Sequence, residues 1–323
     1  MHKQSRRASS ARRPAHGKAT AVGKRRASPF TVTLAATALL LLTSLTTMAA
    51  GHRQQTNHNQ HLQTMTVRMQ AHRGVSTEFP ENTLVAFRAA VEQGYDIIEL
   101  DPKCTADGVF VILHDTTTDR TGRPRHDQGE PLPSNDIRKL TLAQARQLEF
   151  GSWLAPQFRG EPIPTLADVL DFARGSTIHL KFDNCWQSFT ETQRQSFLDQ
   201  LAAAGLGERM GITVNSLSLL QTAATRLPQA EIHWDGANDD ATLRRVVELS
   251  RGHRLTIWVC FDNAMTAWFK GAEKASEALC RRVRQYGDIG LWILSREDER
   301  QRAIQLFHAD AIETTGSLKP MGR

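Results

Sequence analysis

The stretch IIELDPKCTADGVFVILHD, residues 97–115, contains two short apolar runs separated by a turn signal. The runs, 97–101 and 109–113, are rich in β-branched and aromatic residues, which favour strands. The Asp107-Gly108 pair between them is a dipeptide typical of tight turns. The stretch therefore predicts two consecutive short strands joined by a turn.

Polar side chains gather where these two predicted strands end. Glu99 and Asp101 alternate with Leu100, so both carboxylates point to one face of the first strand. Because burying unpaired charge is costly, this face is poor core material and predicts a site for a hard metal ion. His114 follows the second strand and would place an acid or a base beside that site.

A second set of polar residues follows the preceding predicted strand, 67–71. His72 and Arg73 come directly after this strand, and Glu81 and Asn82 precede a run with helical periodicity. Polar chemistry at the C-terminal ends of successive strands, each followed by a turn or a helix, is typical of α/β barrels. The sequence therefore predicts a barrel with its site at one end.

The motifs HRG…PENT, ELD…T.DG and V..HD occur in this order, and together they resemble the glycerophosphodiester phosphodiesterase family. The similarity continues through residues 163–166 and 309–314 and covers roughly residues 66–320. One tripeptide of this kind would be weak, but the ordered set is specific. The resemblance implies a (β/α)8 TIM barrel and a metal-dependent phosphoric diester hydrolase that releases glycerol 3-phosphate and an alcohol.

Length and charge are consistent with one such domain, 66–323, behind an N-terminal extension. The domain is close to the size of about 250 residues that is typical of TIM barrels. Nine of the 40 Lys and Arg residues lie in the basic tail, 1–28, which contains no acidic residue. The rest of the chain, with all 34 acidic residues, is slightly acidic, so the net charge of +6 comes from the tail. Nucleic-acid binding by the domain is not predicted.

An apolar segment, 29–50, follows the basic tail and carries no charged residue. A positive flank before an apolar run predicts an export signal, and this run is also long enough to span a bilayer. A cleaved signal peptide and a transmembrane anchor therefore both remain open. A polar linker, 51–65, comes next. In either case we expect the domain outside the cytoplasm, secreted, periplasmic or anchored to the membrane.

Nine strand-like runs compete for the eight places of the barrel. In order they are 67–71, 97–101, 109–113, 178–182, 210–214, 231–234, 255–261, 290–294 and 311–314. One run must be short or displaced. The run 231–234 is the first candidate, and which run it is stays open.

The resemblance assigns catalysis and metal binding to particular residues. His72 and His114 would be the acid/base pair. One would deprotonate the nucleophile, often the neighbouring glycerol hydroxyl, and the other would protonate the leaving alcohol. Which histidine has which role stays open. Glu99 and Asp101 would bind one divalent metal ion, Ca²⁺ or Mg²⁺ by resemblance.

Five further residues are assigned to the substrate or to its surroundings. Arg73 and Lys181 would bind phosphate, and Trp292 would line the substrate pocket. Glu81 and Asn82 would shape the first loop and would support the residues that touch the substrate. Asn82 could instead cap the helix that follows.

The predicted strand 178–182 departs from the family pattern, in which an acidic metal ligand stands two residues before a lysine. Lys181 matches the lysine, but His179 stands in the place of the acidic residue. Imidazole suits softer ions, so His179 as a ligand brings Mn²⁺ or Zn²⁺ into consideration. Asp183, on the same face of the strand, could compensate for the lost negative charge.

Three functions fit this sequence. The first is hydrolysis of water-soluble glycerophosphodiesters. The second is lysophospholipase D or phospholipase D-like action on membrane lipids, which an uncleaved anchor would favour. The third, motivated by His179, is an inactive family member that binds phosphate or lipid. No stretch suggests a partner protein, and the oligomeric state stays open.

Overall fold

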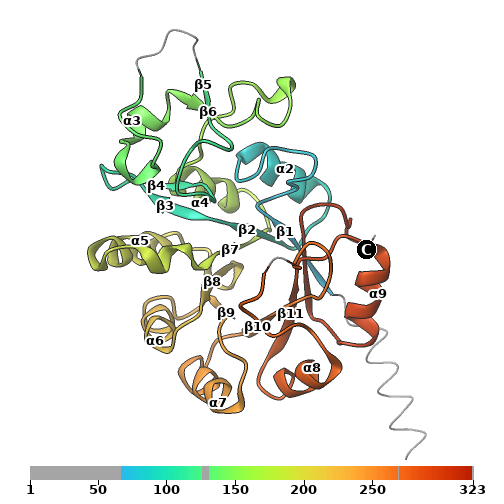
Figure 1. Cartoon of the computed structure of the whole chain (residues 1–323). Coiled ribbons are helices and arrows are strands. Elements are labelled where there is room, and N and C mark those ends of the chain that lie inside the picture. Colours follow the sequence, from blue (N-terminus) through green and yellow to red (C-terminus); the bar gives the residue numbers. More distant parts are fainter. Residues whose placement is uncertain (1–66, 126–130, 268, 322–323) are drawn as a thin grey trace, which may run out of the picture. The chain divides into compact units, whose positions relative to one another are not determined.

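The computed structural model describes residues 67–125, 131–267 and 269–321, in which eight parallel strands form a closed barrel (Figure 1). Neighbouring strands around the barrel follow the order β1-β12-β11-β10-β9-β8-β7-β2. Their bounds are β1 Arg68–His72, β2 Ile97–Leu100, β7 His179–Phe182, β8 Met210–Val214, β9 Glu231–Trp234, β10 Leu255–Cys260, β11 Asp288–Trp292 and β12 Ala311–Thr314. The predicted TIM barrel is confirmed.

Helices lie outside the barrel, and each follows a barrel strand in the chain, α4 only after a long insertion (Figure 1). They are α2 Leu84–Glu92, α4 Leu166–Arg174, α5 Glu191–Ala203, α6 Leu217–Arg226, α7 Asp240–Leu249, α8 Glu277–Val283 and α9 Glu297–Gln305. Threonine side chains cap the starts of α2, α4 and α5, where they accept hydrogen bonds from otherwise unpaired backbone N–H groups. At α2 this cap is Thr83, so the expectation that Asn82 caps the helix is wrong.

The first candidate for the displaced run is also wrong. The run 231–234 forms β9 inside the barrel, paired with β8 and β10. The displaced run is 109–113, whose β4 (Phe110–Ile112) pairs antiparallel with β3 (Pro102–Cys104). The physical reason is the short turn at Asp107-Gly108. A parallel neighbour requires a crossover of a dozen residues or more, whereas a tight turn can only join antiparallel strands.

The segment between β2 and α4 is an insertion with a small core of its own. It holds the β3–β4 hairpin, the pair β5 (Arg123–Pro124) and β6 (Leu148–Glu149), and α3 (Leu142–Ala145). Its buried apolar residues are Val111, Leu113, Ile137, Leu140, Ala145, Leu148, Phe150 and Ile163. This packing holds His114, which follows the hairpin, at the end of the barrel.

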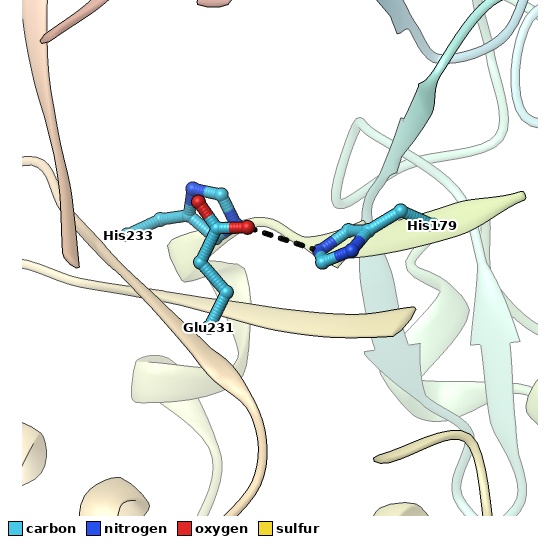
Figure 2. Close-up of side chains that lie close together, drawn as sticks. All are labelled: His179, Glu231 and His233. Carbon is cyan, nitrogen blue, oxygen red and sulfur yellow. Dashed lines mark ion pairs between the residues drawn. The ribbon is translucent and has the colours of Figure 1, made fainter. Parts of the chain in front are cut away.

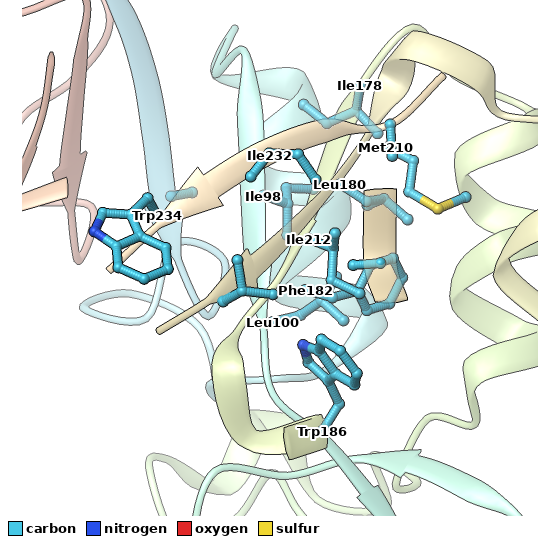
Figure 3. Packing of buried hydrophobic residues seen from close by; sticks show 14 of the residues in the cluster. Ile98, Leu100, Ile178, Leu180, Phe182, Trp186, Met210, Ile212, Ile232 and Trp234 are labelled. Carbon is cyan, nitrogen blue, oxygen red and sulfur yellow. The ribbon is translucent and has the colours of Figure 1, made fainter. Parts of the chain in front are cut away.

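Alternation along the strands separates the main core from the polar barrel interior. On β2 and β7, Leu100, Leu180 and Phe182 pack into the apolar cluster that the barrel shares with its helices (Figure 3). Glu99 and Lys181, which pair in register, point to the opposite side and line the cavity at the barrel end. Hydrophobic burial therefore holds these charged groups in place.

The N-terminal segments predicted as basic tail, apolar segment and polar linker lie outside the described residues. Among the helices that the structure describes, none is both long and apolar enough to cross a bilayer.

Candidate active site

A cavity of about 240 Å³ opens at the C-terminal ends of the barrel strands. It brings together seven residues that the sequence assigned to the site, namely His72, Arg73, Glu99, Asp101, His114, Lys181 and Trp292. Asp183, Asn184, Asp235, Trp258, Phe269, Ile293 and Glu313 complete its lining. The site therefore draws on seven barrel strands or the loops after them and on the insertion.

The carboxylates of Glu99 and Asp101 are both buried. The backbone N–H of Arg73 donates to Glu99 Oε2 at 2.9 Å, and Asn82 Nδ2 donates to Asp101 Oδ2 at 2.8 Å. Burial opposes ionisation of Asp101, but Arg73 together with the other cations nearby and the Asn82 hydrogen bond outweighs burial and lowers the pKa. Burial and the neighbouring Asp101 and Asp183 raise the pKa of Glu99 well above its usual range. The site thus holds more negative charge than its own cations neutralise.

Asp183 joins these carboxylates from the end of β7. Ligand atoms of Asp101, Asp183 and Cys185 all lie within 4.8 Å of one another. Burial raises the pKa of Asp183, in the same sense as that of Glu99. Burial also raises the pKa of the Cys185 thiol, so this side chain stays protonated and is a poor metal ligand. Asp101 and Asp183 are therefore the oxygen donors that lie together for a divalent cation, and Glu99 lines the same cavity.

The two histidines differ in their surroundings. His72 Nε2 lies 4.0 Å from Glu99 Oε2, and its side chain is 16% exposed. Burial, reinforced by Arg73, lowers the pKa of His72 to about 3, so this imidazole is neutral near pH 7. His114 is 41% exposed, and its Nδ1 lies 2.6 Å from Asp115 Oδ1.

Arg120 connects the insertion to the loop after β1. Its guanidinium donates to both oxygens of Glu81 and to Asp115 Oδ2, each at 2.7 Å. Glu81 also accepts from Arg73 Nη1 at 3.1 Å. Glu81 therefore connects the two loops that carry His72 and His114.

Lys181 lies at the floor of the cavity between an acid and an aromatic ring. Its Nζ is 3.4 Å from Glu313 Oε2 and 4.2 Å from the centre of the Trp258 ring. Trp258 Nε1 donates to His233 Nδ1 at 3.0 Å, which fixes the indole plane. The indole fits only because residue 290 is glycine, since a Cβ there would lie 2.6 Å from the Trp258 ring. The ammonium group is thus held in place by both packing and charge.

His179 is not brought to Glu99 and Asp101. It pairs in register with Ile97, two residues before Glu99, and so lies one side-chain layer deeper in the barrel. There it joins Glu231 and His233, with the His179 Nε2 atom 3.6 Å from Glu231 Oε2 (Figure 2).

The ligand atoms of this second group also lie within 4.8 Å of one another, but its chemistry fits a metal ion poorly. Arg68 Nη1 and Nη2 each donate to Glu231 at 2.7 Å, so a cation already neutralises the carboxylate. Because the indole N–H of Trp258 can only donate, Nδ1 of His233 accepts, and the proton of the neutral imidazole is on Nε2. That Nε2, 4.0 Å from Glu231, has no lone pair for a metal.

We expect the two deep histidines to make the fold sensitive to acid. Burial lowers the pKa of His179 from 6.5 to about 4 and that of His233 well below 6.5. At a pH between the folded and the unfolded pKa of each histidine, the unfolded chain binds more protons than the folded chain. The unfolding free energy therefore falls as the pH falls. Each histidine contributes up to about 1.4 kcal/mol per pH unit.

Urea unfolding at several pH values measures this slope. His179→Gln should reduce the slope by about one proton's contribution. The matched control is His308→Asn, because His308 is exposed and has φ 52, which asparagine tolerates. A slope that His179→Gln leaves unchanged would contradict the prediction.

Some site residues were missed from the sequence. Asp235 directly follows β9, just as Asp101 follows β2, and this position could have identified it. It was missed because the run 231–234 was the first candidate for a run outside the barrel. Burial, followed by the charge of Asp183, raises the pKa of Asp235 to about 7. Phe269 lies in the loop after β10 and gives no signal of its own in the sequence.

Known proteins that are similar to this chain point to one family. The model of the Glycerophosphoryl diester phosphodiesterase family matches residues 72–287. A glycerophosphodiester phosphodiesterase of Caldanaerobacter subterraneus subsp. tengcongensis is 43% identical over 101 residues, which span 31% of this chain and 38% of that protein. Glycerophosphodiester phosphodiesterase 1 of Bos taurus is 39% identical over 115 residues, 35% of this chain and 32% of that protein. These relatives are thus matched over well under half of their length.

Solved structures share the fold. A phosphodiesterase of Oleispira antarctica, in complex with the product sn-glycerol-3-phosphate, matches with a TM-score of 0.60 and 20% identity. The match covers 79% of this chain and 96% of that one. A protein of Silicibacter pomeroyi matches with a TM-score of 0.60 and 18% identity over 80% of this chain and 91% of that one.

Proposed function

Because this chain belongs to the glycerophosphoryl diester phosphodiesterase family, we propose that it hydrolyses glycerophosphodiesters to glycerol 3-phosphate and an alcohol. The observation that carries the proposal is one cavity lined by His72, His114, Arg73, Lys181 and a cluster of carboxylates. A phosphodiester needs positive charge on its oxygens, an activated nucleophile and a proton for the leaving alkoxide. The residue types in this cavity can meet all three requirements. An inactive binding protein would have no need for a second histidine.

The carboxylate cluster fits a divalent cation. Glu99, Asp101 and Asp183 would hold it, because burial and mutual repulsion raise the pKa of Glu99 and Asp183, and a cation would relieve that repulsion. Hard oxygen donors favour Ca²⁺ or Mg²⁺ over Mn²⁺ or Zn²⁺. When bound, such an ion supplies Lewis acidity toward a phosphoryl oxygen.

The surroundings of the two histidines divide their roles. His72 is neutral and can accept a proton from the glycerol hydroxyl next to the phosphate. That hydroxyl oxygen then attacks phosphorus, and the P–O bond to the alcohol breaks. His114, paired with Asp115, donates a proton to the departing alkoxide. Water subsequently opens the cyclic phosphate, with the two histidines in exchanged roles.

Arg73 and Lys181 would bind the phosphate from two sides. The Arg73 guanidinium is held by Glu81 at 3.1 Å and by Asp101 Oδ2 at 3.5 Å. Lys181 is buried beneath the carboxylates and, although burial opposes its charge, Glu313 and other acids outweigh burial and raise its pKa. Both cations are thus charged and positioned before substrate arrives, which limits reorganisation during the reaction.

The proposal is tested by ³¹P NMR of the full chain incubated with glycerophosphocholine and a divalent cation. We expect glycerol 3-phosphate as the phosphorus product. Choline phosphate would mean cleavage of the other ester bond and would contradict the proposed role of the glycerol hydroxyl. Lysophosphatidylcholine is tested as a second substrate in the same assay. Equal turnover of both substrates would favour the lipid-cleaving alternative. Substrate binding without turnover would favour the inactive family member.

The place of His179 leads to a prediction about metal affinity. His179→Gln should leave the cation concentration for half-maximal activity unchanged within about twofold, whereas loss of a ligand weakens binding by at least about tenfold. Asp183→Asn is the matched comparison and should weaken binding. Titration of Mg²⁺ or Ca²⁺ into chelated enzyme measures both. If His179→Gln needed a much higher cation concentration for half-maximal activity, His179 would be a ligand after all.

Export of the domain is also part of the proposal, and it rests on the apolar segment 29–50 behind the basic tail. Fractionation of cells that express the full chain with a C-terminal tag tests it. Tagged protein of full length in the membrane would indicate an anchor, and a shortened form outside the cytoplasm would indicate a cleaved signal. Full-length protein in the cytoplasm would contradict export.

A further inference from the structure

A second cavity, of about 650 Å³, adjoins the active-site cavity. Five residues line both cavities, namely Asn184, Asp235, Trp258, Phe269 and Trp292. The second cavity extends from these shared walls over the loops after β8, β9 and β10, through Asn215, residues 236–238, Cys260 and residues 271–273. A phosphate bound at Lys181 would therefore have room on this side for one of its two ester groups.

Aromatic rings form the wall between the two cavities. Phe269 and Trp292 meet edge to face, with ring centres 5.3 Å apart and planes at 72°. Trp258 presents its ring beside them, with one face already covered by Lys181. Aromatic faces attract cations, most strongly alkylammonium groups that are weakly hydrated.

The charge of the second cavity is negative. Asp235 and Glu273 line it, and none of the described residues that line it is Lys, Arg or His. Arg282 pairs with Glu273 at 2.8 Å and donates to the Asn238 carbonyl at 3.1 Å, yet it is not part of the lining. Asp235 Oδ2 has a hydrogen bond only from Asn184 Nδ2, at 3.4 Å, among the bonds found for the described residues. A carboxylate beside aromatic rings is the arrangement that binds an organic cation.

We propose that this second cavity binds a cationic alcohol, of the amino-alcohol or quaternary ammonium class, as the leaving group of the substrate. The inference rests on the proposed function and narrows its substrate class. The cation lies between the Asp235 carboxylate and the rings of Phe269 and Trp292, while the phosphate stays with Lys181 and the carboxylate cluster. Uncharged alcohols enter the same cavity but gain neither the charge pairing nor the cation–π contact.

The test compares two alcohols of the same shape, choline and 3,3-dimethylbutan-1-ol, which differ in a quaternary nitrogen or carbon. Each is added as an inhibitor of glycerol 3-phosphate release from glycerophosphoglycerol by the full chain. The assay runs at about pH 8, where a carboxyl with the raised pKa of Asp235 is mostly ionised. We expect choline to inhibit at about tenfold lower concentration than its uncharged isostere.

Two variants test whether the preference for choline arises in the second cavity. In Asp235→Asn and in Phe269→Leu the ratio between the two alcohols should fall to about twofold or less. The ratio is measured within each variant, so a general loss of activity does not affect it. Equal inhibition by both alcohols in the wild-type protein, or a ratio that neither variant changes, would overturn the inference.

Equilibrium dialysis of labelled choline, with the uncharged alcohol as competitor, gives the same comparison without turnover. Turnover of glycerophosphoglycerol without choline preference refutes this inference alone. Absence of turnover with preferential choline binding refutes the proposed reaction and keeps the cation site.

Discussion

Replacement of His114 by alanine is expected to lower kcat for glycerol 3-phosphate release by about a hundred- to ten-thousandfold, the usual contribution of a general acid. The leaving alkoxide is a strong base, so without a proton donor the P–O bond breaks with full negative charge on oxygen. His114 is placed for this role by the hairpin that precedes it and by Asp115 at 2.6 Å. Steady-state kinetics with glycerophosphocholine measures the change.

Two controls separate chemistry from folding in that experiment. His308→Asn changes an exposed residue that does not line the cavity and should leave kcat unchanged. Asp115→Asn should reduce kcat less than His114→Ala does, because it removes only the partner of the imidazole. Retention of most of the activity in His114→Ala would mean that another group protonates the alcohol. Added imidazole should restore part of the activity of His114→Ala, since the exposed position leaves room for it.

Removal of divalent cations is expected to lower activity at least about a hundredfold, because a metal ion supplies several kcal/mol of transition-state stabilisation. Restoration should be most effective with Ca²⁺ or Mg²⁺, the ions preferred by carboxylate oxygens. Chelation followed by addition of Ca²⁺, Mg²⁺, Mn²⁺ or Zn²⁺ tests this order. Restoration by Zn²⁺ alone would instead indicate a nitrogen ligand.

Thermal unfolding provides a second readout that does not depend on turnover. The buried Glu99, Asp101 and Asp183 repel one another without a cation, so added Mg²⁺ or Ca²⁺ should raise Tm. Glu99→Gln lowers the repulsion and should both raise the Tm of the chelated protein and reduce its response to the cation. A Tm that no cation changes would contradict a metal site at these carboxylates.

Much of the site could be predicted from the sequence because its residues follow apolar strand runs. Alternation places Glu99 and Asp101 on one face, and strand ends place His72 and Lys181 at one edge of a parallel sheet. Such local rules need no knowledge of distant contacts. They were sufficient for the barrel and for half of the residues that line the cavity.

Tertiary structure alone decided how deep each side chain lies in the barrel. The run 109–113 is wholly apolar and the run 231–234 contains Glu231 and His233, so composition favours the first run as a barrel strand. In the folded protein the first run pairs outside the barrel and the second pairs within it. His179 and Lys181 share one face of β7, but register with β2 sets Lys181 beside Glu99 and His179 one layer below.

The sequence by itself thus determined the residue types and the face on which each lies, because strand periodicity is local. It could not determine how deep each side chain lies in the barrel or which loops contact one another. Strand register and loop packing depend on partners far along the chain. That is why Asp183 replaces His179 among the proposed ligands, and why Asp235 and Phe269 emerge as one wall only in the folded protein.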